Sequence, residues 1–593
     1  PTVIEFHRLQ SAYQTARRDL LAQRGEAGHW VGWLSSSALS TATATSALAL
    51  VATHTTDPSR RRAGRELAAR GIDWLCRNQK DDGGWGDTDR SASNIATTML
   101  VRAAFHLADV ADAHSERLAR AEAYIERQGG ADGLHHRYGD DKTFAVPILT
   151  NCALAGLVPW QEVSPLPFEL AALPFSVLRF LNLPVVSYAV PALVAIGQAR
   201  FFHHRPRNPL TWLLRRFSVW PSMKALAKMQ PADGGYLEAA PLTSFVVMSL
   251  AATRRADHPV ARRGMRFLLD SVREDGSWPI DTNLATWNTT SAIQALAVAT
   301  GEVGALGCTD WLLDCQHDQR HPFTNAEPGG WGWTDLSGAV PDADDTAGAL
   351  LALTALEHSA SQTRRDRTRV EAAHGVRWLL NLQNSDGGWP TFCRGWGRLP
   401  FDRSGADLTA HAIRALAAWA RAVPDTERIP DAIAAGFRFL ADRQRPDGSW
   451  IPLWFGNQHH PEEENPVYGT ARVLLAYRDL GKIASEEAQR GLQWLCASRC
   501  LDGGWGCGLP DRGPSSIEET ALAVEALLSD PRNPSIEPVL EGALERLVHA
   551  VEQGRHRHPA AIGFYFAKLW YHEYLYPMIF TVSALGRAVR TLE

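Results

Sequence analysis

Three aspartates stand within four positions in the string VPDADDTAGA, directly before a run of small apolar residues. They are Asp342, Asp344 and Asp345. A helix N-terminus explains one such residue, because its carboxylate accepts amide hydrogen bonds and meets the positive end of the helix dipole. Three neighbouring carboxylates cannot all ionise cheaply, so at least one pKa should be raised and a proton retained near neutral pH. The cluster therefore predicts a proton donor.

A histidine follows 67 residues after Asp344, in GADLTAHAIRAL, at the start of another predicted inner helix. A buried or capping residue is the plain structural interpretation of His411. If His411 faces the aspartates, its charged form can hold one carboxylate ionised and leave another as the acid. The separation is about one sequence repeat, which permits contact between them in a ring of helices.

Aromatic residues indicate what this acid protonates. The chain contains 21 Trp, and those that directly follow a glycine turn are expected to be structural. Trp287, Trp333 and Trp454 are displaced by a few residues toward the next helix, where the repeat itself does not require them. Ring faces attract cations, each by about 0.5–2 kcal/mol. An acid beside a dry, aromatic-lined cavity is suited to carbocation chemistry.

One phrase recurs along the chain: an aromatic-Leu pair, a Gln, and then Asp-Gly-Gly-Trp or a close variant. Its copies end at Trp85, Tyr236, Trp278, Trp331, Trp389, Trp450 and Trp505, with weaker copies at Trp30 and near Leu134. We interpret each copy as a helix ended by a glycine turn, with the aromatic folded back onto that helix. An Ala-rich inner helix follows each turn.

These repeats predict an all-α protein of two (α/α) barrel or toroid domains. Residues 1–20 together with about 280–593 should form a C-terminal-type barrel that carries the acid motif. Residues from about 21 to 279 should form the second barrel. The pattern alone does not distinguish a closed barrel from an open solenoid.

The segment near 208–226, NPLTWLLRRFSVWPSMKAL, predicts an amphipathic helix in the second barrel. Its apolar face carries Leu210, Leu213, Leu214 and Phe217, with Trp212, Trp220, Arg215, Arg216 and Lys224 around it. Basic flanks and interfacial Trp are typical of a helix that lies on an anionic membrane. Packing of the same face onto the second barrel is an equally weighted alternative.

Composition narrows the function classes. Lys plus Arg number 60 against 65 Asp plus Glu, a net charge of −5, so no basic field recruits nucleic acid. The eight Cys lack the paired spacing of a zinc site, and reduced thiols are expected. We expect no metal, no cofactor, and a peripheral or monotopic location on the cytoplasmic face of a membrane.

The repeat and the Asp-x-Asp-Asp-Thr-Ala string resemble the class II triterpene cyclase family, of which squalene–hopene cyclase is the bacterial type. The resemblance covers essentially the whole chain. It implies that Asp344 is the general acid, flanked by Asp342 and Asp345. His411, within ADLTAH, matches the family's activating histidine, with Asp407 as its acidic neighbour.

The resemblance also implies contacts between aromatic side chains and the substrate. The implied substrate-binding residues are Trp160, Trp287, Trp333, Trp454, Phe392, Cys393, Phe564 and Tyr571. The segment between Trp389 and His411 is shorter than is usual in the family, so a cavity Tyr often found there has no clear counterpart.

The implied function is proton-initiated polycyclisation of a lipophilic polyisoprenoid, squalene to a hopene-type pentacyclic triterpene or hopanol, by a membrane-attached homodimer. A cyclase of another chain is the first alternative: a twenty-carbon diphosphate, a thirty-five-carbon polyprene or a prenylated aromatic. A zinc-dependent protein prenyltransferase and a non-catalytic helical-repeat binding protein are further alternatives.

Overall fold

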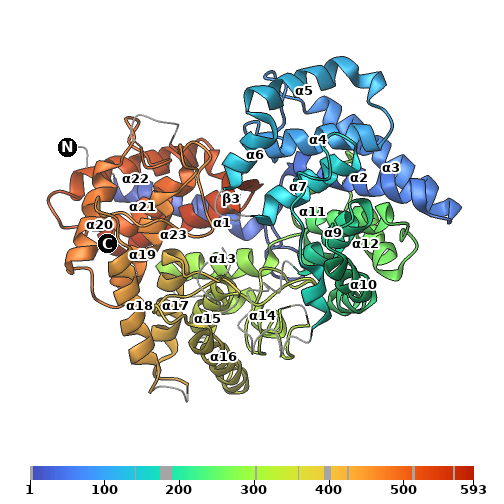
Figure 1. Ribbon diagram of the computed structural model, residues 1–593. Coiled ribbons are helices and arrows are strands. Elements are labelled where there is room, and N and C mark those ends of the chain that lie inside the picture. The colour runs from blue at the N-terminus through green and yellow to red at the C-terminus, as the bar shows by residue number, and fades with distance from the viewer. Residues whose placement is uncertain are drawn as a thin grey trace.

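The computed structural model describes residues 5–139, 142–173, 190–300, 303–322, 324–357, 360–392, 402–423, 427–509, 515–564 and 568–593, without the side chains of residues 142, 143, 300 and 564. The fold is all-α, as predicted, and its helices form two groups that lie side by side (Figure 1). Within the described ranges, strands form only two small sheets, β1 (Ser36–Ser37) with β2 (Trp278–Pro279) and β3 (Ala560–Phe564) with β4 (Leu569–Glu573).

In the described residues, the N-terminal group is a closed ring of five inner helices, each of which contacts the next. They are α2 (Ala38–His54), α4 (Ile95–Leu107), α7 (Lys142–Leu154), α9 (Val190–His203) and α11 (Ala240–Ala252), and α11 returns to contact α2. Around them lie α3 (Pro58–Arg77), α5 (Ser115–Arg127), α6 (Gly130–Tyr138), α10 (Pro209–Met229) and α12 (Pro259–Asp270). We call this group the N-ring.

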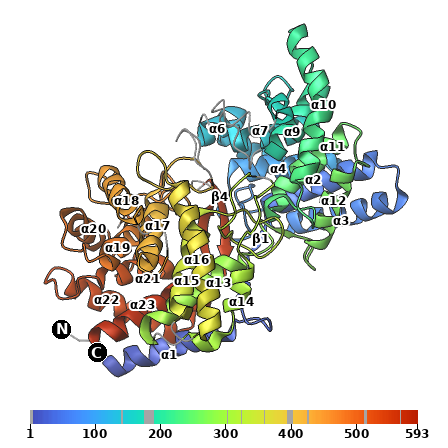
Figure 2. The same cartoon turned by 90° about the horizontal axis from the view of Figure 1, so that it is seen from below.

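The C-terminal group, here the C-ring, closes in the same way. Its inner helices are α13 (Ala285–Thr300), α15 (Ala343–Glu357), α17 (Ala406–Trp419), α19 (Pro466–Asp479), α21 (Ile517–Leu527) and α23 (Tyr576–Leu592), and α23 contacts α13. Its outer helices are α14 (Thr309–Asp314), α16 (Gln362–Leu382), α18 (Ile429–Arg443), α20 (Glu486–Ala497), α22 (Glu537–Glu552) and α1 (Phe6–Ala22) (Figure 2). Both rings are closed, which decides between the two arrangements that the repeat left open.

Short 3-10 helices connect some of these elements. They are η1 (Asp112–His114), η2 (Phe168–Ala172), η4 (Tyr236–Glu238), η5 (Gly304–Leu306) and η6 (Arg555–Arg557).

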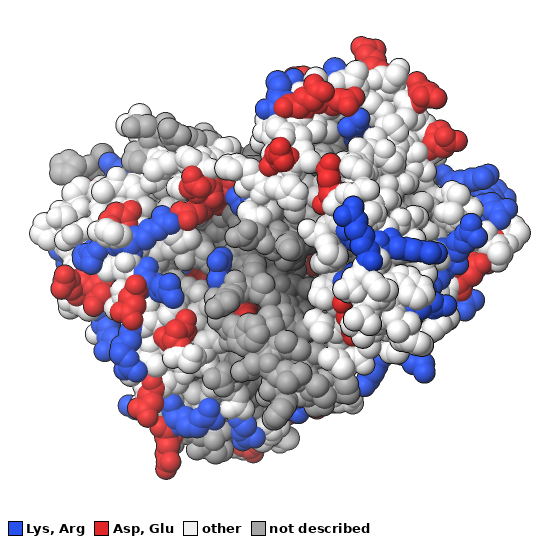
Figure 3. Space-filling view, in the orientation of Figure 1, with Lys and Arg blue, Asp and Glu red and all other residues white. Residues whose placement is uncertain are grey.

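Composition explains which helices lie inside. In α2 every residue from Ala38 to Ala52 is buried, so small Ala, Ser and Thr side chains are needed for close packing on all sides. The outer helices are amphipathic and turn their charged residues to solvent, and Figure 3 shows both signs of charge on both rings.

The repeated turn has a constant geometry, seen at Trp389. Its indole Nε1 donates to the carbonyl of Leu379 on the preceding outer helix at 2.9 Å, and its backbone N–H donates to Thr409 Oγ1 on the next inner helix at 3.0 Å. Gly387 has a φ of 88°, which favours glycine. Trp389 is fully buried. The first Trp of the repeat is therefore structural, as predicted.

The Gln that recurs in the phrase joins neighbouring repeats. Gln383 Nε2 donates to the Gly387 carbonyl at 2.8 Å and to the Ala432 carbonyl of α18 at 2.9 Å. One side chain thus holds its own turn and the following outer helix, which explains why the phrase carries an amide rather than an apolar residue.

The chain exchanges its N-terminal helix α1 into the C-ring, where it contacts α22 and α23, and one turn of the repeat then closes each ring. The backbone N–H of Trp30, near the N-terminus, donates to Thr289 of α13 in the C-ring, at 3.0 Å. The backbone N–H of Trp278 donates to Thr41 of α2 in the N-ring, at 3.1 Å. From this exchange we propose the division into residues 1–20 with about 280–593, and about 21–279; the boundaries stay a prediction.

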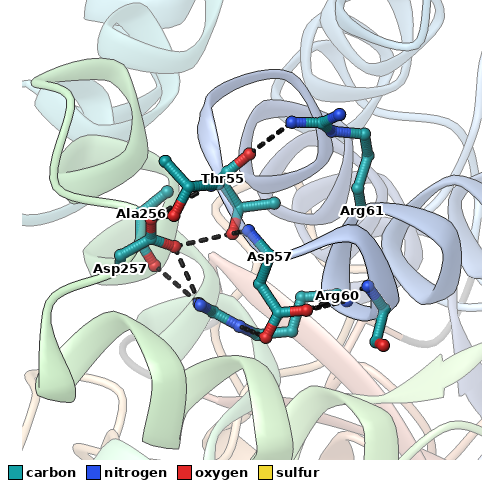
Figure 4. Close-up of polar contacts among 8 residues, drawn as sticks. Thr55, Asp57, Arg60, Arg61, Ala256 and Asp257 are labelled. Carbon is teal, nitrogen blue, oxygen red and sulfur yellow. Dashed lines mark hydrogen bonds and ion pairs between the residues drawn. The ribbon is translucent and has the colours of Figure 1, made fainter.

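A polar cluster at the edge of the N-ring helps to close it (Figure 4). Asp257, between α11 and α12, accepts a hydrogen bond from Thr55 Oγ1 at 2.6 Å and pairs with Arg60 at 2.9 Å. The Thr55 and Thr56 bonds lower the pKa of Asp257 well below its usual range. The cluster ties the turn after α2 to the turn after α11, the first and last inner helices of this ring.

Replacing Gln383 by Leu should remove its hydrogen bond to the Gly387 carbonyl of its own turn and its hydrogen bond to the Ala432 carbonyl of α18. The carbonyls of Gly387 and Ala432 lose their partner, so we expect a cost of about 1–3 kcal/mol, measured as a lower midpoint of thermal unfolding. Gln362 on the same helix is exposed and bonds only Asp366, so Gln362→Leu should stay within about 0.5 kcal/mol. Equal shifts in the two variants would contradict the structural role of Gln383.

Candidate active site

The aspartate cluster forms the start of α15. The backbone N–H of Asp342 donates to the Trp331 carbonyl at 2.9 Å, and its Oδ1 accepts the backbone N–H of Asp345 at 2.8 Å. Asp342 therefore caps the helix, the role that one aspartate alone would have. Asp344 and Asp345 lie in the first turn, near the positive end of the helix dipole.

The structure brings His411 to Asp344 across neighbouring inner helices α15 and α17. Nδ1 of His411 lies 2.7 Å from Oδ1 of Asp344, and the indole Nε1 of Trp287 donates to Oδ2 at 3.2 Å. The Asp344 side chain keeps 17% of its surface exposed, whereas Asp342 and Asp345 are each 4% exposed. Asp344 is therefore the carboxyl of the three that a substrate can reach.

Burial raises the pKa of Asp342 to about 7 and raises that of Asp345 well above its ordinary value, and their side chains share a hydrogen bond. These two residues retain the proton that the sequence led us to expect in the cluster. Burial acts in the same sense on Asp344, but His411, Arg472 and the Trp287 bond together outweigh it and lower its pKa. We expected Asp344 to hold its proton at rest; the lowered pKa instead makes it a strong acid.

Burial also lowers the pKa of His411, although Asp344 opposes this effect. His411 is 5% exposed, so its charged form loses most of its hydration. Both members of the pair therefore release protons readily, and the doubly protonated pair is favoured by acid.

Arg472 is a site residue that the sequence analysis missed. It lies on α19, where its charge interacts with Asp344 and Asp407, and its guanidinium lies 5.7 Å from the ring centre of Tyr468. Its position within the small, apolar stretch PVYGTARVLLAY was the available signal, because an arginine on a buried inner helix needs a partner.

Asp407 lies at the start of α17 and is hydrogen-bonded to the segment that carries Trp454. Its Oδ1 accepts the backbone N–H of Leu453 at 2.9 Å, and burial raises its pKa to about 6. The neighbouring Trp454 is held in addition by an indole bond to Thr391 Oγ1 at 3.0 Å. Asp407 thus helps to fix the segment that carries Trp454, and its place as the acidic neighbour of His411 stays a prediction.

Aromatic rings surround the Trp287 indole that contacts Asp344. The ring centre of Trp287 lies 4.2 Å from Tyr576, 6.2 Å from Phe455 and 6.4 Å from Phe580. The hydroxyl of Tyr571 lies 3.0 Å from that of Tyr576. The structure therefore brings the predicted Trp287 and Tyr571 to the acid, and adds Tyr576, Phe455 and Phe580.

A second aromatic group contains Phe392, whose ring centre lies 6.3 Å from Trp333 and 6.0 Å from Trp454. The carbonyl of Trp333 accepts the backbone N–H groups of Thr286 and Trp287, at 3.0 and 3.2 Å. This pair of bonds joins the second group to the acid cluster.

Three other predicted residues are not placed at the acid. Trp160 lies in the N-ring, stacked on His203 with ring centres 4.8 Å apart. Cys393 lies outside the described residues. Phe564 belongs to β3, but its side chain also lies outside them.

The site combines a carboxyl group of lowered pKa, an imidazole and surrounding aromatic rings, on two closed α/α rings. This is the arrangement of a class II terpene cyclase. Two family models match the chain: the squalene-hopene cyclase C-terminal domain over residues 284–590 and the N-terminal domain over residues 13–211. The chain belongs to the squalene–hopene cyclase family.

Individual relatives are distant. Squalene–hopene cyclase of Bradyrhizobium diazoefficiens is 25% identical over 89% of this chain and 86% of that protein. Enfumafungin synthase of Hormonema carpetanum is 26% identical over 84% of this chain, which spans only 42% of that protein. Among solved structures, ent-copalyl diphosphate synthase from Streptomyces platensis has the same fold, with 18% identity, a TM-score of 0.52, and coverage of 99% of this chain and 100% of that one.

Cyclase activity should rise as the pH falls. We predict that alkene protonation uses the acid form of Asp344, whose pKa is lowered, so the population of this form should grow by up to about tenfold per pH unit between about pH 8 and 5. The measurement is kcat/KM against pH, with circular dichroism to show that the protein stays folded.

The variant His411→Ala provides the matched test. Without the imidazole the pKa of Asp344 should rise, so the decline of kcat/KM with rising pH should begin at a higher pH. The maximum rate should drop, because the acid is weaker. A profile that is flat in the parent, or unmoved in the variant, would contradict this interpretation of the pair.

Proposed function

We propose that this chain cyclises a linear polyisoprenoid by protonating its terminal alkene, and that the substrate is squalene, converted to a hopene-type triterpene or hopanol. The observation that carries the proposal is the 2.7 Å contact of His411 with Asp344, whose second oxygen receives the indole of Trp287. This contact places a strong acid among aromatic rings.

In the first step the alkene π pair forms a C–H bond to the carboxyl proton of Asp344, and the O–H bond breaks. The carboxylate that remains is stabilised by His411, Arg472 and the Trp287 indole, the same groups that lower its pKa. An alkene is a weak base, so stabilising the conjugate base is what makes transfer feasible.

The cation then moves along the chain as successive double bonds attack it, and proton loss or water capture ends the cascade. Each ring face lowers the energy of a nearby cation by about 0.5–2 kcal/mol. Holding the flexible substrate folded removes most of the entropy cost of concerted ring closure. Trp287, Trp333, Phe392 and Trp454 are the residues that we assign to this task.

Two considerations favour squalene. The family model is that of squalene–hopene cyclases, and relatives with this name are matched over most of their length. An exposed apolar helix face, described below, suits uptake of an uncharged hydrocarbon from a bilayer. A twenty-carbon diphosphate, a thirty-five-carbon polyprene and a prenylated aromatic are alternative substrates.

Product analysis tests the proposal. Parent protein incubated with squalene should give a cyclic triterpene, and Asp344→Asn should lower the rate by at least about a hundredfold, because an amide cannot donate the proton. Asp366→Asn, an exposed position on α16, is the control and should keep full activity.

Other outcomes decide between the alternatives. Turnover of geranylgeranyl diphosphate but not squalene would overturn the substrate and keep the acid mechanism. Full activity in Asp344→Asn would overturn the mechanism itself. Dependence of activity on bound zinc would favour the prenyltransferase alternative.

We also propose that the chain attaches to a membrane through α10. This helix projects from the rim of the N-ring (Figure 2), and large apolar side chains on it are exposed to solvent. The exposed fractions are 75% for Leu210, 45% for Leu213, 56% for Leu214, 71% for Phe217 and 61% for Trp220. A contiguous apolar face of this kind indicates a partner surface.

The opposite face of α10 packs against the N-ring through Val219, Met223 and Leu226, so the helix is apolar on two sides. The alternative that the predicted face packs on the barrel is therefore wrong for Leu210 to Phe217. Arg215 was predicted as a basic flank, but it turns inward and pairs with Glu169 at 3.3 Å. Arg216 and Lys224 remain exposed beside the apolar face.

Among the described helices, none combines the length and apolarity needed to cross a bilayer. We propose a peripheral or monotopic location, on the cytoplasmic face. The homodimer stays a prediction.

The double variant Leu214→Glu/Phe217→Glu should release the protein from lipid vesicles. A large side chain buried in the interface contributes about 1.5–3 kcal/mol, so vesicle binding should weaken by at least about tenfold. The measurement is co-flotation with vesicles of phosphatidylglycerol and phosphatidylcholine. The control is Leu501→Glu, a residue of the C-ring that is 90% exposed but isolated. Equal binding by parent and double variant would contradict the assignment of α10.

A further inference from the structure

Two consecutive residues between α10 and α11 have backbone angles that side chains rarely adopt. Leu237 has a φ of 57° and Glu238 a φ of 54°, and neither is glycine. Each such residue costs about 1–2 kcal/mol, so strain of this kind persists only where the surroundings fix it. Glu238 is only 1% exposed. A strained, buried glutamate needs a reason, and its contacts provide one.

The carboxyl of Glu238 joins the N-ring to the loop that leads into the acid motif. Oε1 accepts the backbone N–H of Gly338 at 2.7 Å, and Oε2 accepts the Thr282 hydroxyl at 3.0 Å. The Glu238 carbonyl also accepts the backbone N–H of Thr282 at 3.2 Å. Gly338 lies within residues 334–341, between Trp333 and Asp342, which we call the acid loop.

The acid loop approaches Glu238 as closely as a backbone can. A Cβ added at Gly338 would lie 2.6 Å from Oε1 and 2.7 Å from the backbone nitrogen of Glu238. A side chain at position 338 would therefore displace the loop. A second bond, from the backbone N–H of Asp233 to Ser337 Oγ at 3.3 Å, lies beside the first.

The surroundings of this carboxyl favour its neutral form. Burial raises the pKa of Glu238 to about 9, and the nearby carboxyls of Asp233 and Asp281 act in the same sense. As a carboxylic acid, Glu238 can accept the Gly338 N–H on one oxygen and still donate its proton to Asp233.

We propose that Glu238 is a positioning residue for catalysis: its carboxyl group, on the N-ring, fixes the acid loop and thereby sets the geometry of Trp333 and the aspartates. The consequence for chemistry rests on the proposed function. The acid loop directly follows Trp333, whose carbonyl accepts the backbone N–H of Trp287. It leads directly into Asp342, which caps α15. A loop displaced by about 1 Å can cost about a hundredfold in rate.

Three variants test the inference with the full chain: Glu238→Ala, Glu238→Gln and Gly338→Ala. Glu238→Ala and Gly338→Ala should each lower kcat for cyclisation by about 10–100-fold with little change in KM, because the acid is misplaced rather than the substrate lost. Glu238→Gln should stay within about threefold of the parent, because its amide accepts from Gly338 and donates to Asp233 as the acid does. Failure of Gln to rescue, or parent-like kcat in Glu238→Ala, would overturn the inference.

A merely structural glutamate is excluded by a matched control. Glu518 on α21 is also buried, and burial raises its pKa as well. Glu518→Ala should lower the unfolding temperature without lowering kcat. If Glu238→Ala behaves in the same way, the positioning role is wrong.

Hydrogen exchange separates this inference from the proposed function. In Glu238→Ala the amide of Gly338 loses its acceptor, so exchange across residues 334–341 should become faster even if no polyisoprenoid is turned over. Unchanged hydrogen exchange would overturn the inference that Glu238 fixes the acid loop. Faster exchange with no activity in the parent would overturn only the proposed function.

Discussion

The hydrogen bond between His411 and Asp344 is the interaction on which the site depends. It makes one carboxyl of three acidic, since the imidazole, Arg472 and the Trp287 indole all stabilise its charge. The other two aspartates sit behind it and keep their proton. The cluster thus separates two tasks that the sequence had suggested for a single group: retaining a proton in the protein and giving one up to a weak base.

The repeat supplies the rigidity that this bond requires. Asp344 and His411 lie at the starts of adjacent inner helices, and each helix start is fixed by the same turn, in which the Trp indole donates to the preceding helix and the Trp backbone N–H donates to a Thr hydroxyl oxygen on the next. Because the turns before these two helices are built alike, Asp344 and His411 face each other at the starts of neighbouring helices. The acid pair therefore needs only a few particular residues at positions that the repeat already fixes.

The sequence was sufficient for the all-α fold and for the residues of the acid pair, because both follow from local patterns: a recurring phrase and short motifs. It was insufficient for charge states. The pKa of Asp344 is lowered by His411 and further by the charge of Arg472 on α19, a residue far from Asp344 in the chain that no spacing rule identifies. Arg215 shows the same limit, since a helix pattern cannot tell a flank exposed to solvent from one facing Glu169.

Buried carboxyls also hold the two rings together. Asp87 of the N-ring accepts the backbone N–H of Trp570, and Glu573 accepts that of Trp33; burial raises the pKa of both, for Glu573 to about 7. Glu238 acts in the same way on the acid loop. A carboxyl whose pKa is raised by folding stabilises the protein fully below its ordinary pKa, and this contribution is lost as the pH rises through the raised value. The joint between the rings should therefore loosen toward alkaline pH, while acid favours the protonated form of Asp344. Assembly of the site is thus favoured on the acid side, where neutral carboxyls hold the frame, and the proton transfer that we propose for Asp344 is favoured on the same side.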